Sequence, residues 1–120
     1  MHDRRDVILT MLDEERGVTA VSMGWLRDQY EPEWIRLSTA RVVEIGEWLT
    51  QREIRYLPSP LPSRETEEVM LYRPSSLIGT YISAARMEGI FAKHPTTAAY
   101  MLGELSKKLE RLEAVSDAEH

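Results

Sequence analysis

The sequence predicts an α+β fold that is mostly helical, with one β-hairpin placed between two groups of helices. Apolar residues recur every three or four positions through the first fifty residues, which is the spacing of one buried helix face. Two short segments, 52–57 and 69–73, instead alternate between apolar and polar residues, as half-buried strands do. After Pro74 the helical spacing returns and continues almost to the C-terminus.

The N-terminal segment predicts one helix over residues 3–16, with Gly17 as its stop. Four apolar residues there are spaced to share one face of the helix: Val7, Ile8, Met11 and Leu12. Residues 18–20 are too short to stand alone as a strand, but they can add a small third strand to the hairpin.

Two further helices are expected before the hairpin. Ser22 is a candidate N-cap for the first, which ends before Glu31-Pro32, and Ser38 is a candidate N-cap for the second. The second helix has an inward apolar stripe of Val42, Ile45, Trp48 and Leu49. Its opposite face offers Thr39, Arg41, Glu44, Glu47 and Gln51 to solvent. Trp25 and Trp48 are expected to be core anchors.

The hairpin has a long tip that contains Pro58, Pro60 and Pro62. Proline lacks the backbone donor and fixes φ, so this segment is neither a helix interior nor a central strand. We expect a stiff, protruding tip of roughly ten residues, longer than a usual hairpin loop. Such a tip should contribute little to the core, so deleting 59–66 should leave stability nearly unchanged.

The last third predicts a helix capped by Ser75 or Ser76 and broken at His94-Pro95, followed by a final helix from Thr96 or Thr97. In that helix apolar residues follow a heptad spacing, with Leu102, Leu105, Leu109 and Leu112 between Ala98 and Ser116. We expect this stripe to pair with its counterpart in a second chain, giving a two-fold homodimer. The last six residues are expected to fray.

Composition excludes several classes of protein. The chain has no cysteine, which rules out disulfides and thiolate catalysis, and no apolar run long enough to cross a membrane. These features favour a cytoplasmic protein. The net charge is -5, but the window 34–64 holds five arginines and three glutamates, a net of +2. The remainder holds ten cations and seventeen anions, a net of -7.

Nothing in the sequence indicates an enzyme. The three histidines, His2, His94 and His120, are far apart and have no carboxylate at metal-ligand spacing. No phosphate-binding glycine loop and no nucleophile motif is present. We therefore expect no catalytic residue, no metal site and no cofactor.

The segments SMGWLRDQY, STARVVEIGEWLTQ and VMLYRP, in this order, resemble winged helix-turn-helix domains. The resemblance covers roughly residues 5–73 and implies a winged-helix domain over 3–73, with a C-terminal helical extension over 75–116 for dimerisation. It implies double-stranded DNA as the partner and a homodimeric transcriptional regulator or DNA-organising factor. The DNA-binding residues it implies are Thr39, Arg41 and Gln51 on the reading helix and Arg55 and Arg64 on the hairpin.

Each of these assignments has an alternative. Arg41 can pair with Glu44 or Glu47 on its own helix, and the hairpin arginines can belong to an ordinary charged hairpin. Some winged helices have lost DNA binding and dock proteins instead. The alternative function is therefore a winged-helix protein-interaction module.

Overall fold

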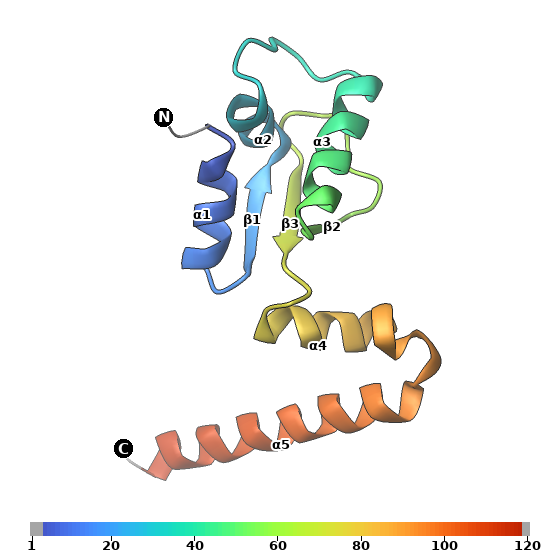
Figure 1. Cartoon of the computed structure of the whole chain (residues 1–120). Helices are drawn as coiled ribbons and strands as arrows, with labels where there is room; N and C mark the ends of the chain where they lie inside the picture. The colour runs from blue at the N-terminus through green and yellow to red at the C-terminus, as the bar shows by residue number, and fades with distance from the viewer. Residues whose placement is uncertain (1–3, 119–120) are drawn as a thin grey trace. The chain divides into compact units, whose positions relative to one another are not determined.

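A computed structural model describes the backbone of residues 4–118 and the side chains of residues 4–115. The chain has an α+β fold, as predicted (Figure 1). Its elements, in order, are α1 (Asp6–Glu14), β1 (Val18–Ser22), α2 (Met23–Tyr30), α3 (Thr39–Gln51), β2 (Arg55–Leu57), β3 (Glu68–Tyr72), α4 (Leu77–Arg86), the 3-10 helix η1 (Gly89–Lys93) and α5 (Pro95–Ala118).

The chain divides into two compact units, up to Gly79 (unit 1) and from Thr80 onward (unit 2). The expected domain boundary at Asp3 lies outside the described residues, as do His2 and His120. No helix in residues 4–118 has the length and apolar character required to span a membrane.

Unit 1 contains a three-stranded antiparallel sheet with the strand order β1-β3-β2. The central strand β3 pairs Leu71 with Thr19 on one side and with Tyr56 on the other. The third strand is therefore present, and it is longer than the expected residues 18–20. Leu71 is completely buried, because strands cover both of its edges and helices pack on the sheet.

The helix α1 ends at Glu14, two residues before the expected end, and Gly17 lies in the turn that follows, with a φ of +92° in the left-handed region that favours glycine. A Cβ atom at this position would lie only 2.4 Å from Cβ of Ser76. The backbone of Gly17 also accepts a hydrogen bond from Arg73 N at 2.8 Å. The turn after α1 thus packs directly against the segment that follows β3.

The core of unit 1 lies between the sheet and its helices. In Figure 1, α1 lies beside β1 and α3 lies beside β2, and both pairs of elements are in contact. The buried apolar residues come from α1, β1, α2, α3, β3 and the segments on either side of β2: Ile8, Leu12, Val21, Met23, Leu26, Tyr30, Val42, Ile45, Trp48, Leu49, Ile54, Leu61, Val69 and Leu71. Of the two expected tryptophan anchors, Trp48 is buried and Trp25 packs half-buried against this core.

The predicted N-caps of α2 and α3 are confirmed. The Ser22 hydroxyl accepts a hydrogen bond from Trp25 N at 3.1 Å, and the Ser38 hydroxyl accepts one from Arg41 N at 3.3 Å. Each bond satisfies one of the backbone donors left open in a first helical turn. The beginnings of α2 and α3 are consequently set by local chemistry.

In unit 2 the helix expected to reach His94 ends earlier, at Arg86. Met87 adopts a left-handed φ of +56°, and Glu88 N donates to the carbonyl of Ser83 at 2.9 Å, which closes a Schellman-type end. A short 3-10 helix then brings Phe91 into a small core with Ala84 and Ala98. The expectation of one helix up to His94 was wrong, because the chain must turn after Arg86 for Phe91 to be buried.

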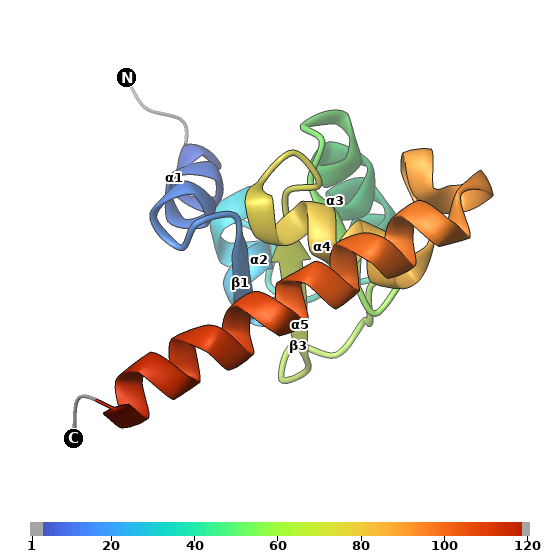
Figure 2. The ribbon, with the colours of Figure 1, turned by 90° about the horizontal axis from the view of Figure 1, so that it is seen from below.

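The final helix α5 begins at Pro95, one or two residues before the expected start at Thr96 or Thr97, and proline is well suited to a first helical position. Of the last six residues, which were expected to fray, 115–118 belong to α5, and 119–120 lie outside the described residues. Figures 1 and 2 show α5 as one helix without a break.

Candidate nucleic-acid interface

The predicted reading helix α3 turns one face to the core and another to solvent. Ile45 and Leu49 are completely buried, and Gly46 approaches the sheet so closely that a Cβ there would lie 2.9 Å from the Tyr56 hydroxyl. The solvent-exposed arc of the helix contains Thr39, Ala40, Val43, Glu44, Glu47, Thr50 and Gln51. This exposed arc is the part of α3 that a partner can reach.

The three predicted reading residues do not form one patch. Thr39 and Gln51 both lie on the exposed arc, but twelve residues of helix separate them by about 18 Å. Arg41 lies on a different side of α3 and is half-buried. Its guanidinium donates to the carbonyl of Arg36 at 2.8 Å and lies 4.9 Å from the ring centre of Trp34. Arg41 therefore braces the loop before α3.

The middle of the exposed arc is acidic. Glu44 and Glu47 are both exposed there, and the two residues between them, Ile45 and Gly46, carry no charge. Glu44 accepts a hydrogen bond from the Tyr30 hydroxyl at 2.7 Å. Burial, together with this hydrogen bond, raises the pKa of Tyr30 to about 12. Two carboxylates in this position would repel phosphates along the length of the helix.

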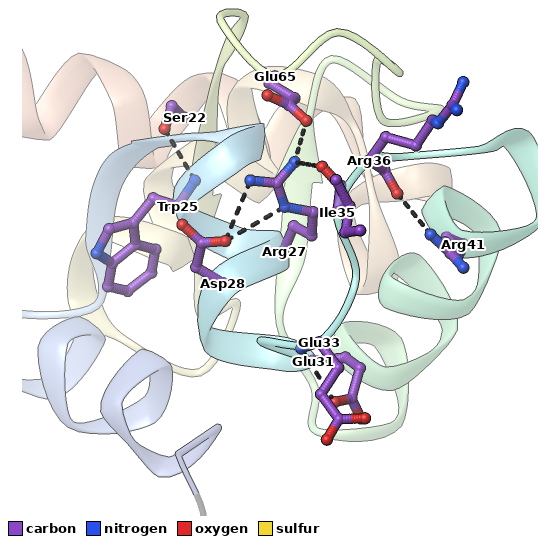
Figure 3. A network of polar contacts seen from close by, with 10 residues as sticks. All are labelled: Ser22, Trp25, Arg27, Asp28, Glu31, Glu33, Ile35, Arg36, Arg41 and Glu65. Carbon is purple, nitrogen blue, oxygen red and sulfur yellow. Dashed lines mark hydrogen bonds and ion pairs between the residues drawn. The ribbon is translucent and has the colours of Figure 1, made fainter.

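Arginines gather at the N-terminal end of α3, where α2, the loop 31–38 and the hairpin tip meet (Figure 3). Arg27 of α2 forms ion pairs with Asp28 and with Glu65 of the tip, and it donates to the carbonyl of Ile35 at 2.9 Å. Its side chain is only 13% exposed, so it acts as a tie among the three segments. Sequence reasoning missed Arg27 because Glu65, the partner that ties it to the tip, lies 38 positions further along the chain.

Arg36 and Arg64 are the exposed arginines of this region. In Figure 3 the Arg36 guanidinium extends away from the network, while its backbone carbonyl holds Arg41. Arg64 precedes Glu65, the residue that anchors the tip to Arg27. Arg36 is a candidate contact that the sequence indicated only through the positive window 34–64.

The hairpin tip does not protrude freely, so the expectation that it contributes little to the core was wrong. Leu61 is 6% exposed and belongs to the core of unit 1. Beyond it, Glu65 O accepts a hydrogen bond from Gly24 N at 3.0 Å, and Glu67 O accepts one from Met23 N at 2.9 Å. The tip therefore satisfies open backbone donors at the start of α2 and packs on α3.

An open cavity of about 320 Å³ lies between α3 and the folded tip. Apolar side chains form most of its wall, and Glu47, Thr50 and Gln51 form its polar edge. The remaining lining residues are Val42, Val43, Gly46, Tyr56, Pro60 and Leu61. Val43, half of whose surface is exposed, connects this cavity to the exposed arc of α3.

The remaining predicted arginine lies elsewhere on the hairpin. Arg55 begins β2, is exposed and pairs in register with Tyr72 of β3. Arg52, at the end of α3, lies 4.6 Å from the ring centre of Trp48. Arg36 and Arg41 thus lie at the beginning of α3, Arg52 and Arg55 follow its end, and Arg64 lies on the tip, so these arginines do not form a single stripe along the helix.

The predicted dimerisation residues differ in their surroundings. Leu102 packs against the small core of Ala84, Phe91 and Ala98 within unit 2. Leu105 is half-buried, whereas Leu109 is 52% exposed and Leu112 is 65% exposed. Among residues 4–118, no three histidine, aspartate or glutamate residues are grouped so that they could hold a metal ion.

The comparisons with known proteins leave the interface to be interpreted from its own geometry. No family model matches the chain, and neither a curated protein nor a solved structure shows significant similarity to it.

Proposed function

We propose that unit 1 is a winged helix-turn-helix domain and that the chain is a double-stranded DNA-binding regulator. The observation that carries the proposal is the element order α1-β1-α2-α3-β2-β3 on a sheet ordered β1-β3-β2, with arginines at the start of α3. In helix-turn-helix proteins the second helix enters the major groove, and its N-terminal residues contact base edges. The start of α3 is therefore the end expected to face the duplex.

The charge distribution supports an approach by this end of the helix. Arg36 is exposed two residues before Ser38, the N-cap of α3, where the helix dipole also favours an anion. Arg64 is exposed on the tip segment that Glu65 joins to Arg27 of α2. Arginine stays charged and can bind phosphate through two N–H groups. The acidic pair Glu44 and Glu47 lies further along α3 and disfavours a helix laid along its full length in the groove. Thr39 is then the reading residue, and Gln51 is too distant to share its contact.

Fluorescence anisotropy with labelled random and genomic duplexes, at two salt concentrations, tests this proposal. Arg36→Ala and Arg64→Ala should each weaken binding to all sequences and reduce the salt slope by about 1, because each removes one phosphate contact. Thr39→Ala should weaken discrimination among sequences with little change in the salt slope. Arg111→Ala, which removes an exposed arginine from α5, is the matched control and should change neither.

Absence of binding to any duplex by the folded protein, at roughly 50 mM salt and micromolar concentration, would overturn the DNA proposal. A second candidate is then the better one, a winged-helix module that docks a protein. The apolar cavity between α3 and the tip favours it, since Val43 and Leu61 line a hollow edged by Glu47. Interfaces between proteins use such apolar depressions with a charged rim.

A further inference from the structure

The second half of α5 carries an apolar stripe that the described chain leaves largely uncovered. Leu105, Leu109 and Leu112 follow one another at intervals of four and three residues, which keeps them on one face of a supercoiled helix. Leu109 and Leu112 are 52% and 65% exposed, and the neighbouring Val115 is 56% exposed. Large apolar side chains in an unbroken row of this kind are a mark of an interaction surface.

The charged residues beside the apolar stripe indicate which partner, in which orientation, would cover it. With Leu109 at heptad position a and Leu105 and Leu112 at position d, Lys108 occupies position g and Glu113 occupies position e. In a parallel pair of helices, a g residue meets the e residue that lies five positions later in the other chain. Lys108 of each copy then meets Glu113 of the other, which gives two equivalent ion pairs.

Antiparallel pairing lacks this complementarity. When Leu105 is matched with Leu109 of an antiparallel copy, Lys108 faces Lys108, and like charges repel. When Leu112 is matched with Leu109, Lys108 faces Val115. Neither antiparallel arrangement places a carboxylate opposite Lys108, so charge complementarity favours the parallel one.

We propose that α5 pairs with α5 of a second copy of this chain as a parallel, in-register two-stranded coiled coil. Leu109 and Leu112 lie at its centre, and Lys108 pairs with Glu113 of the second copy. Two heptads are short for an isolated coiled coil. Here the first half of each helix is already held in unit 2, where Leu102 packs against the small core of Ala84, Phe91 and Ala98. The helix is therefore ordered before it pairs, and this goes beyond the proposed DNA contact of unit 1.

Single cysteines test the orientation, because the chain contains none of its own. Leu112→Cys should form a disulfide between two chains rapidly under mild oxidation, since a parallel pair sets each position d against itself. Glu110→Cys, on the outward position b of the same helix, is the control and should remain largely reduced. Equal cross-linking of the two variants, or none at Leu112→Cys in a dimeric protein, overturns the parallel arrangement.

Charge reversal tests the proposed ion pairs by sedimentation. Glu113→Lys and Lys108→Glu should each raise the dimer dissociation constant by several-fold to about tenfold, because two exposed pairs become repulsive. The double variant should restore the native value, and Glu110→Lys should leave it unchanged.

Sedimentation of the native chain separates this proposal from the proposed function. A monomer at tens of micromolar, or a trimer, overturns the coiled coil. A monomer that still binds DNA overturns it while leaving the DNA proposal intact. A parallel dimer that binds no duplex overturns the DNA proposal and leaves the coiled coil intact.

Discussion

The two units of this chain bury their apolar side chains to very different extents. Among the residues that the structure describes, unit 1 encloses fourteen apolar residues in one core, including Ile45, Leu49 and Leu71, which are completely buried. Unit 2 buries Ala84, Phe91 and Ala98, while Tyr100, Ile90, Leu109, Leu112 and Val115 remain exposed. Since burial of apolar surface is the main driving force of folding, the core of unit 1 stabilises its fold more than the core of unit 2 does. Unit 2 has an apolar surface that a second chain can cover.

The difference has a simple geometric origin. In unit 1 a sheet and three helices surround a common interior, and the hairpin tip covers one more side through Leu61. In unit 2 a helix of 24 residues runs well beyond the segments that pack on it. One helix can bury only one stripe against its neighbours, so the far end of α5 stays uncovered.

Phe91→Ala should have the largest effect, and it should be confined to unit 2. Phe91 is the only large side chain in the three-residue core of that unit, and removing a buried phenylalanine typically costs about 3–5 kcal/mol. Hydrogen exchange should then become fast for amides of η1 and the first half of α5, while those of α3 stay protected. Fast exchange throughout both units would show that the two stabilities are linked.

Ile45→Ala should destabilise unit 1 by about 2–5 kcal/mol, because a completely buried side chain leaves a cavity in a packed core. The matched control is Leu112→Ala, which removes an exposed side chain and should change the stability of the monomer by less than about 0.5 kcal/mol. Urea unfolding of both variants at low protein concentration measures the contrast. Similar losses would mean that Leu112 is already buried in solution.

Leu61→Ala should cost about 2 kcal/mol, near the lower end for a buried leucine, because it lies at the margin of the core beside an open cavity. Ser63→Ala, at an exposed position of the same tip, should have almost no effect. Melting temperatures of the two variants provide the comparison. Equal melting temperatures for the two variants would indicate that Leu61 and the tip contribute little to the core.

Alkaline pH should destabilise unit 1 through ionisation of Tyr30, and this loss of stability should be smaller than the losses caused by the core substitutions above. Burial raises the pKa of Tyr30 from 10.0 to about 12, so the folded state favours the neutral phenol. Its contribution to stability is fully present below about pH 10, where the unfolded chain begins to ionise, and is lost as the pH rises toward 12. Tyr30→Phe, which cannot ionise, should lack this component when urea midpoints are compared across that range.

The presence and order of the helices and strands, and the bounds of α2 and α3, followed from local chemistry and could be predicted from the sequence. Other bounds differed: the strand expected over 52–57 begins only at Arg55, and α1 ends at Glu14 instead of 16. Ser22 and Ser38 cap α2 and α3 through bonds to backbone donors three residues later. The period of two near Tyr56 and Leu71 became strands, and the stripe of Val42, Ile45 and Leu49 became the buried face of α3. Each of these signals lies within a few residues of the element that it defines.

The candidate interface could be predicted only in part. The positive window 34–64 indicated arginines near α3, but not that Arg41 would brace the carbonyl of Arg36 or that Arg27 would hold Glu65. Those contacts join residues up to 38 positions apart. Their partners are chosen by the approach of separate segments, and one sequence carries no local signal of that approach.

The amino-acid sequence by itself determined which segments of this protein are helices and strands and which of their faces are apolar, because periodicity and capping act over a few residues. Only the tertiary structure decided that the proline-rich tip folds back through Leu61, that a turn after Arg86 buries Phe91, and that α5 keeps Leu109 and Leu112 exposed. Those outcomes depend on which surfaces meet. The physical reason is that burial is a property of the assembled volume, to which distant residues contribute together.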